Sequence, residues 1–405
     1  YQWDLNYANP MVFNDMTDNL LYLANRGMDV IRLDAIPYIW KQLGTDCRNL
    51  PQVHTLARMM NLACYIVCPG VLLLGEVVME PQKVAPYFGT PAKPECQMLY
   101  NVTTMCTTWH TLATRDVRLL RRQLEQVFSL PGHHLFQNYL RCHDDIGWGL
   151  DYPWLSQFGF GEVSHKKYLN DWFTGAWPGS PSRGELYNDD PRLGDARLCG
   201  TTASLCGLET AVSPEEITQA LQCDLMLHAM MLSLSGLPVL YSGDEIAQLN
   251  DYTYRNDPEK CSDSRYVHRG RFHWDLAENR FDSQTVQGRL FAGLRKLEDI
   301  RASHLAFRAD AAAEVFDTGS DQVLGIRRCF GEELFTALFN FSEIPKEIGN
   351  PAKGADVLFT GDRQQGDVLS LPSYGFVWMI SSYLTDTHQP VDVAIQFVFD
   401  EILYQ

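Results

Sequence analysis

The stretch "DVIRLDAIPYIW", residues 29–40, decides the fold because it combines a buried-strand pattern with two charges. Its Val, Ile and Leu residues are typical of a strand that is apolar on both faces, as in a parallel sheet covered on both sides. Arg32 and Asp34 stand two residues apart, so their side chains share one face of the strand. A lone Arg or Asp near a strand end is more often a surface ion pair or a turn residue. The rest of the chain must therefore decide whether these two charges begin a functional site.

Strands and helices alternate through the first 300 residues or so. A helix is predicted from Pro10, capped by Asn9, and a second from Pro51 to the Pro69-Gly70 break. Further helices are predicted over 111–128 and from Ser213 to Gly236, the latter with a capping box. Four more apolar runs predict strands: "VLLLGEVV" (71–78), "CQMLYN" (96–101), "FQNYLRCHDD" (136–145) and "LPVLYSGDE" (237–245). The alternation predicts an α/β fold with a parallel sheet.

Two regions depart from this alternation. Residues from about 146 to 205 are rich in Gly, Pro, Trp and Tyr without a long periodic stretch, and so long a loop in a compact domain is usually functional. From 306 to 381 the pattern changes to β-type segments separated by Gly, Asp and Asn turns, which predicts a small antiparallel β-sandwich domain. We therefore predict an α/β domain over 1–305, an all-β domain over 306–381 and a tail of unknown structure over 382–405.

Composition excludes several classes of protein. The 405 residues are 45% hydrophobic with a net charge of -17, which indicates an ordered globular protein that phosphate-bearing partners would repel. Nucleic acid and anionic membranes are thus disfavoured as partners, and no apolar run is long enough to span a bilayer. The eleven cysteines are scattered and mostly lie in apolar segments, which favours free thiols in a reducing, cytoplasmic setting. No second pair accompanies Cys64 and Cys68, so we predict no metal site.

Acidic residues recur at the ends of the predicted strands. Four strands end in such groups: Asp34, Glu76, the run His143-Asp144-Asp145, and Asp244 with Glu245. The carboxyl ends of parallel strands face one common site, so these side chains should converge. Taken singly, Asp145 and Asp244 fit turn or cap residues, and a buried His is usually a core residue. The conjunction on four strands favours a site.

Glycoside cleavage is a chemistry that uses such a set. Retaining enzymes need two carboxylates about 5 Å apart, one ionised as nucleophile and one protonated as general acid. An adjacent Arg32 would hold Asp34 ionised, and burial of Glu76 in an apolar strand would raise the pKa of its carboxyl. Aromatic residues in the long loops suit stacking on sugar rings, although they are also ordinary core residues.

Several segments also resemble a known family. "RLDAI", "GEVV" and "CHDDIGW" resemble, in this order, the second, third and fourth conserved segments of the α-amylase superfamily, glycoside hydrolase family 13. "YQWDLNYANP", "IWKQLGTDCRNLPQ", "LGDARLCGTTASL" and "DSRYVHR" are more closely similar to amylosucrase-type members, over nearly all of residues 1–380. The resemblance implies a (β/α)8 TIM barrel, of which the five strands would be part.

The resemblance also implies roles for individual residues. Asp34 would be the nucleophile, Glu76 the acid and base, and Asp144 the stabiliser of the transition state. The implied substrate-binding residues are Arg32, His143, Asp145, Arg197 and Arg265. The implied reaction cleaves sucrose and passes the glucosyl unit to an α-1,4-glucan with release of fructose, without cofactor or metal.

Three expectations accompany this reading. The first conserved segment of the family, an Asp followed four residues later by Asn-His, is absent from the sequence, so the chain is expected to be the C-terminal portion of a longer enzyme, inactive on its own. A sucrose hydrolase, which differs mainly at the acceptor side, is an alternative within the class. A non-catalytic amylase-like binding protein or inactive fragment is an alternative outside it. The oligomeric state stays open.

Overall fold

Five parallel strands form the central sheet of the computed structural model, which describes residues 3–359 and 364–382. Their order is β1–β2–β5–β6–β10, with β1 and β10 at the two edges, and every neighbouring pair runs parallel. The bounds are Val30–Leu33, Leu72–Gly75, Met98–Tyr100, Leu135–Asn138 and Leu237–Pro238. The five predicted strands are therefore confirmed, although each is shorter than its apolar run because the residues beyond its carboxyl end turn away into loops.

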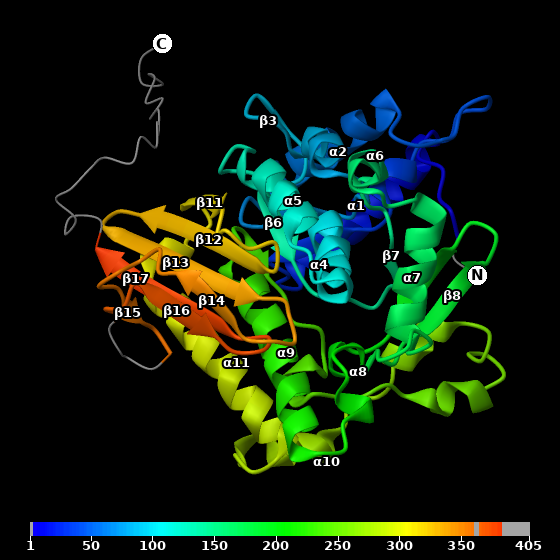
Figure 1. The fold of residues 1–405 in the computed structure, drawn as a ribbon. Coiled ribbons are helices and arrows are strands. Elements are labelled where there is room, and N and C mark those ends of the chain that lie inside the picture. The colour runs from blue at the N-terminus through cyan, green and yellow to red at the C-terminus, as the bar shows by residue number, and fades with distance from the viewer. Residues whose placement is uncertain (1–2, 360–363, 383–405) are drawn as a thin grey trace.

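Helices connect the strands and cover the sheet (Figure 1). The long ones are α1 Pro10–Asn25, α2 Pro51–Val67, α4 Val102–Thr114, α5 Arg118–Phe128, α9 Pro214–Ser233 and α11 Val286–Ser303. The predicted caps are confirmed: Asn9 accepts from the N–H of Met11, and Ser213 forms a capping box with Glu216. The single helix predicted over 111–128 is wrong, because Arg115 adopts a left-handed conformation (φ 57°) that ends α4 before α5 begins.

The region predicted as a long loop, 146–205, has secondary structure of its own. It contains a three-stranded antiparallel sheet of β7 Ile146–Gly147, β9 Asp195–Cys199 and β8 Glu185–Asp190, and the helices α6 Tyr152–Leu155, α7 Glu162–Thr174 and α8 Thr202–Leu205. The prediction of an unstructured loop is wrong for two reasons. The strands are too short for an alternation to be recognised, and the buried face of α7 includes the polar His165 and Asn170, which interrupt its apolar stripe.

The C-terminal part is antiparallel, as predicted. One sheet has the order β11–β12–β13–β17–β15 and a second pairs β14 with β16. The bounds are β11 Ala312–Phe316, β12 Val323–Phe330, β13 Glu333–Asn340, β14 Lys346–Gly349, β15 Asp356–Val357, β16 Val368–Leu371 and β17 Phe376–Ser382. Buried residues of this sheet, such as Phe335 and Trp378, belong to the same apolar cluster as Trp109 of α4 and Met226 of α9. The boundary at 306 stays a prediction, and the predicted tail beyond 382 lies outside the described residues.

Two arginines, Arg328 buried and Arg301 half-buried, contact the end of α9. Arg328 of β12, 1% exposed, donates to the carbonyls of Ser233, Leu234 and Arg308, and Arg301 of α11 donates to those of Leu232 and Gly236. The final carbonyls of a helix have no partners within the helix, so these guanidinium groups satisfy them. Burial lowers the pKa of Arg328 to about 9.

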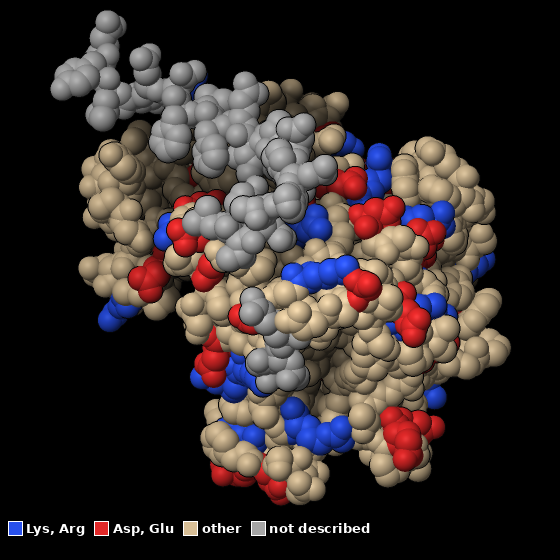
Figure 2. All heavy atoms as spheres, turned by 60° about the vertical axis from the view of Figure 1, so that its left-hand side comes forward, with Lys and Arg blue, Asp and Glu red and all other residues tan. Residues whose placement is uncertain are grey.

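The shorter elements are α3 Pro81–Val84, α10 Trp274–Ala277 and the β3–β4 hairpin of Gly89–Thr90 and Lys93–Pro94. On the face shown in Figure 2, outside the part that grey atoms cover, acidic and basic side chains are interspersed and form no continuous basic surface. Within the described ranges, no helix is both long and apolar enough to cross a bilayer.

Candidate active site

A single guanidinium group connects the strand-end carboxylates that the sequence singled out. Arg32 of β1 contacts Asp34 through Nη1 (2.5 Å to Oδ1) and Glu76 through Nη2 (2.9 Å to Oε1). Its Nε donates to the hydroxyl of Tyr100 at the end of β5, at 2.7 Å. Asp34 and Glu76 immediately follow β1 and β2, which pair in parallel, so the register of the sheet brings the two acids together. The predicted proximity of Arg32, Asp34 and Glu76 is thus present in the structure.

The two carboxylates have different environments. The Asp34 side chain is 68% exposed, whereas that of Glu76 is 16% exposed. Burial raises the pKa of Glu76, and the charges of Asp34 and Asp144 raise it further, while the Ala35 N–H (2.7 Å) and Arg32 oppose the shift. Burial acts to lower the pKa of Arg32, but Glu76 and its other partners outweigh this and raise it, so Arg32 stays charged. Glu76 therefore holds its proton to higher pH than an ordinary glutamic acid does.

The predicted pair His143 and Asp144 lies beyond β6. Nε2 of His143 is 3.2 Å from Oδ2 of Asp144, and Arg269 Nη2 lies 3.3 Å from Oδ1 of the same carboxylate. Nη1 of Arg265 lies farther away, at 3.9 Å. Arg265 is held more closely by Asp263, at 2.7 Å, and its guanidinium lies over the ring of Tyr187. Arg269 is therefore the nearer cationic partner of Asp144.

Asp145 and Arg197 form a second charged group beside the first. Burial raises the pKa of Asp145, Arg197 and Arg265 act against this, and Asp144 adds to it. Arg197 lies on β9 opposite Gly147 of β7, and a methyl group on Gly147 would stand 2.0 Å from Nη1 of Arg197. The guanidinium of Arg197 thus occupies space that only a glycine leaves open.

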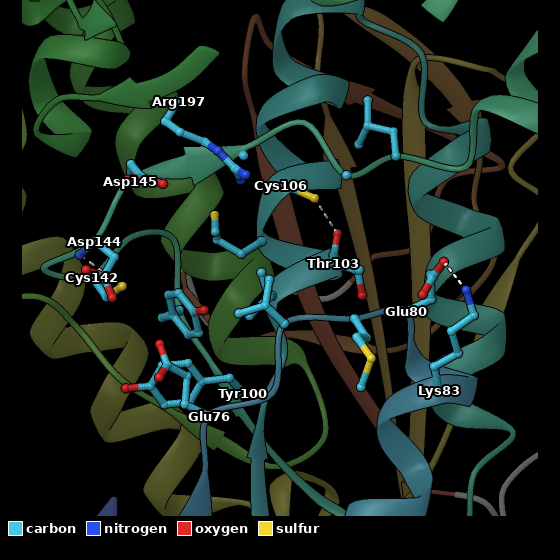
Figure 3. A pocket seen from close by; sticks show the side chains of 18 of the residues that line it. Glu76, Glu80, Lys83, Tyr100, Thr103, Cys106, Cys142, Asp144, Asp145 and Arg197 are labelled. Carbon is cyan, nitrogen blue, oxygen red and sulfur yellow. Dashed lines mark hydrogen bonds and ion pairs between the residues drawn. The ribbon is translucent and has the colours of Figure 1, made fainter. Parts of the chain in front are cut away.

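A cavity of about 940 Å³ joins most of these residues (Figure 3). Glu76, Tyr100, Asp144, Asp145 and Arg197 line one part of it, and Glu80 and Lys83 lie at its other side, linked to each other at 3.0 Å. Asp34 lines a different, smaller cavity of about 310 Å³ between α1 and β1. The structure therefore brings Glu76, Asp144, Asp145 and Arg197 into one cavity, whereas Asp34 and Arg32 line the smaller one.

The described residues contain one group of three side chains at metal-ligand spacing. The ligand atoms of Cys142, His143 and Asp144 lie within 4.8 Å of one another. The guanidinium groups of Arg265 and Arg269 beside Asp144 would repel a cation, and burial raises the pKa of the Cys142 thiol to about 11, which opposes the thiolate form that binds metals. This donor set therefore does not fit a resident metal ion.

Sequence reasoning missed Tyr100, Arg269 and His268. Tyr100 lies near the carboxyl end of a predicted strand, and the carboxyl ends of parallel strands face one site, so its hydroxyl could have been predicted there together with the acids. Arg269 and His268 belong to "DSRYVHR", of which only the first arginine was singled out. Asp244 was weighed as a cap residue and begins the 3-10 turn η5, Asp244–Ile246, where it is buried 3.8 Å from Arg141 and 3.9 Å from His228.

Comparison with known proteins finds similarity to enzymes that act on sugars. Residues 1–145 match the family model described as the alpha amylase catalytic domain. This part of the chain is thus similar to that catalytic domain. The chain is 27% identical over 358 residues to glucosylglycerate phosphorylase of Spirochaeta thermophila, covering 87% of this chain and 57% of that protein. It is 25% identical to glucosylglycerate phosphorylase of Escherichia coli, covering 93% and 65%, and 27% identical to trehalose synthase/amylase TreS of Mycolicibacterium smegmatis, covering 72% and 42%.

Solved structures show the same alpha-amylase-type fold. Sucrose 6F-phosphate phosphorylase from Thermoanaerobacter thermosaccharolyticum superposes with a TM-score of 0.63 at 17% identity, covering 91% of this chain and 64% of that one. The alpha-amylase from H. orenii gives 0.59 at 17% identity, covering 93% and 65%. The chain spans 57% to 65% of the length of the glucosylglycerate phosphorylases that it matches. These named relatives are phosphorylases, a trehalose synthase/amylase and an alpha-amylase, and none of them is an amylosucrase.

Proposed function

We propose that this alpha-amylase-type chain processes α-glucosides with retention of configuration, using Asp34 as nucleophile and Glu76 as general acid and base. The observation that carries the proposal is the Arg32 guanidinium, which contacts both carboxylates at the ends of neighbouring strands. Their environments differ in the sense that this chemistry needs, because Asp34 is largely exposed and Glu76 largely buried with a raised pKa.

The reaction proceeds in two balanced steps. In the first, the Glu76 carboxylic acid gives its proton to the glycosidic oxygen, the bond from that oxygen to C1 breaks, and the Asp34 carboxylate forms an ester with C1. In the second, the Glu76 carboxylate takes a proton from the acceptor hydroxyl, whose oxygen bonds to C1 as the ester breaks. Arg32 orients Asp34 through their contact, and Asp144, held by Arg269 and His143, faces the positive charge that develops at C1.

The donor we propose is sucrose, with fructose as leaving group and an α-1,4-glucan as acceptor. The support is the likeness of "YQWDLNYANP", "LGDARLCGTTASL" and "DSRYVHR" to amylosucrase-type segments. A sucrose hydrolase differs only in that water takes the place of the glucan. The presence of all three acids weighs against a non-catalytic binding role.

Phosphate is a second candidate acceptor. The relatives named above include two kinds of phosphorylase. Arg265 and Arg269 lie beside Asp144, and the positive charge of Arg197 opposes the rise in the pKa of Asp145. Guanidinium groups bind phosphate in a bidentate manner, so these three could hold the anion near C1.

The nucleophile and the acid can be separated with two donors in the full chain. We expect Asp34→Asn to lose turnover of both sucrose and α-glucosyl fluoride. Glu76→Gln should lose sucrose turnover by about 10²- to 10⁴-fold but retain much more with the fluoride, which leaves without a proton. Asp29→Asn is the matched control, since this exposed residue precedes β1 and its backbone carbonyl, which the substitution keeps, accepts from the N–H of Leu72. Unchanged sucrose turnover in Asp34→Asn would refute its role as nucleophile.

The acceptor is identified by supplying sucrose with buffer alone, with maltoheptaose or with inorganic phosphate. Fructose release measures the first step in every case. Free glucose indicates a hydrolase, lengthened maltoheptaose a glucan-forming transferase, and glucose 1-phosphate a phosphorylase. Absence of fructose in all three mixtures would show that sucrose is not the donor.

A further inference from the structure

His268 occupies a buried position among three segments that carry site residues. It ends η7, Ser264–His268, and is 6% exposed. One neighbour is the segment after β6 that contains His143 and Asp144. Another is the turn at Gly200, which follows β9 with its Arg197. The third is the segment of His268 itself, with Arg265 and Arg269.

The contacts of the His268 ring define its tautomer. The backbone N–H of Gly200 donates to Nδ1 at 3.1 Å, so this nitrogen carries no proton. Nε2 lies 3.2 Å from the carbonyl oxygen of His143, which can only accept, so Nε2 carries the proton and donates it. Burial, with the charge of Arg141, lowers the pKa of His268 well below its ordinary value, which keeps the ring neutral.

Arg141 links the backbone of His268 to the turn at Gly200. This buried residue, three positions beyond β6, donates through Nε to the carbonyl of Gly200 at 2.9 Å and through Nη2 to that of His268 at 3.5 Å. Arg269, which holds Asp144, also donates to the same His143 carbonyl that accepts from His268. The three segments are thus tied together by bonds from two buried side chains, His268 and Arg141.

We propose that His268, as the neutral Nε2–H tautomer, is a positioning residue that sets the place of His143 and Asp144 relative to Arg269 and to the β9 loop. This inference rests on the proposed function, because it takes Asp144 to act on the glucoside. Asp144 follows His143 directly, so a carbonyl held by Arg269 alone, without His268, allows the carboxylate to shift away from the glucoside. A misplacement of about 1 Å in such a group can cost about 10²-fold in rate.

The tautomer can be tested without any substrate. Full chain labelled with ¹⁵N-histidine is compared with the His268→Gln variant, and the signals that disappear belong to His268. We expect an unprotonated Nδ1 and a protonated Nε2 that persist on acidification below pH 6. A protonated Nδ1, or a ring that becomes doubly protonated near its ordinary pKa of about 6.5, would overturn the proposal.

Kinetics then test the positioning. We expect His268→Ala to lower kcat for the glucoside donor by about 10- to 100-fold with a smaller change in KM. Added imidazole should partly restore kcat, whereas 1-methylimidazole, which accepts but cannot donate, should restore less. His268→Gln, whose amide can still donate to the His143 carbonyl, should retain more activity than His268→Ala, and it serves where the alanine variant does not fold.

His110→Ala is the matched control, since this buried histidine of α4 lies outside the site and its ring nitrogens have no hydrogen-bond partner among the described residues. It should lose stability but keep kcat. A His268→Ala enzyme within twofold of the parent kcat, or equal rescue by both imidazoles, would overturn the proposal. Failure of the proposed function has a different signature: the parent itself would not turn over glucosides, while the tautomer measurement still decides the bonding of His268.

Discussion

Replacing Gly147 with alanine should displace Arg197 without disturbing the backbone. The new methyl group would stand 2.0 Å from Nη1 of Arg197, where ordinary contact begins at 3.4 Å, so the guanidinium must move by at least about 1.4 Å. The clashing atom is the end of a flexible side chain, and Gly147 is not among the residues with positive φ, so the free energy of unfolding should change by less than about 1 kcal/mol.

The loss in kcat/KM should correspond to more free energy than the loss in stability to unfolding. A hydrogen bond from a charged donor is worth about 1.5–3 kcal/mol, so its loss should reduce kcat/KM for the glucoside donor by roughly 10- to 150-fold. Gly149→Ala is the matched control, because a methyl group there meets no atom within 4 Å and should leave kcat/KM unchanged.

A double-mutant cycle tests the mechanism of the loss. If Gly147→Ala acts by moving Arg197, then adding it to Arg197→Ala should cost almost nothing more, since the displaced group is already absent. We would measure kcat/KM for all four enzymes, together with their melting temperatures. Additive losses, or a Gly147→Ala enzyme within twofold of the parent, would refute the assignment of Arg197 to the glucoside.

Three further predictions concern ionisation and packing. Activity that requires protonated Glu76 should fall as pH rises through its raised pKa. Asp144→Asn removes a charge that raises this pKa, so it should move that limb of the pH–rate profile for sucrose, whose leaving group needs the proton, to lower pH; an unmoved limb would assign it to another group. Arg328→Met should lower the free energy of unfolding in urea by about 3 kcal/mol or more, because three carbonyls lose their donor. The control Arg327→Met should lower it by less than about 1 kcal/mol, because the partner Glu314 is 3.4 Å away and half exposed. Equal losses in the two variants would contradict this. Burial acts to lower the pKa of His228, but the neighbouring Asp224 outweighs burial and raises this pKa. The stability that this pair contributes should therefore be complete below about pH 6.5 and decline as pH rises through the raised pKa. His228→Gln should abolish that decline, and an unchanged stability profile would exclude the pair as its source.

Periodicity and caps predicted most of the central fold from the sequence. The strands around Arg32 and Glu76 and the helices beginning at Pro10, Pro51 and Pro214 follow from apolar runs and capping residues. The break between α4 and α5 could not be predicted in this way, because it depends on the left-handed backbone of Arg115, a residue that ordinarily favours helices. The predicted strands also extended too far at their carboxyl ends, because apolar loop residues beyond β6 and β10 continue the apolar pattern of the strand.

The acids of the site were predictable, but not all of their partners. Parallel pairing of β1 with β2 places Asp34 beside Glu76 by a rule that needs only the strand pattern. Arg269 and His268 act through contacts with the segment after β6, more than a hundred residues earlier, and no local pattern records such a pairing. The exposure of Asp34 could not be predicted either, because it depends on which elements lie around β1 at the edge of the sheet.

The position of Ala35 explains how Glu76 can serve in both steps of the proposed reaction. Ala35 has a left-handed backbone (φ 46°), which costs about 1–2 kcal/mol for a residue with a side chain. In this conformation its N–H donates to Glu76, and a bond to an ionised carboxylate, worth about 1.5–3 kcal/mol, offsets that cost. Burial alone would hold Glu76 protonated, fit to donate but unable to accept a proton in the second step. The Ala35 N–H and Arg32 both stabilise the ionised form and limit the rise of the pKa, so each protonation state remains accessible to the same side chain.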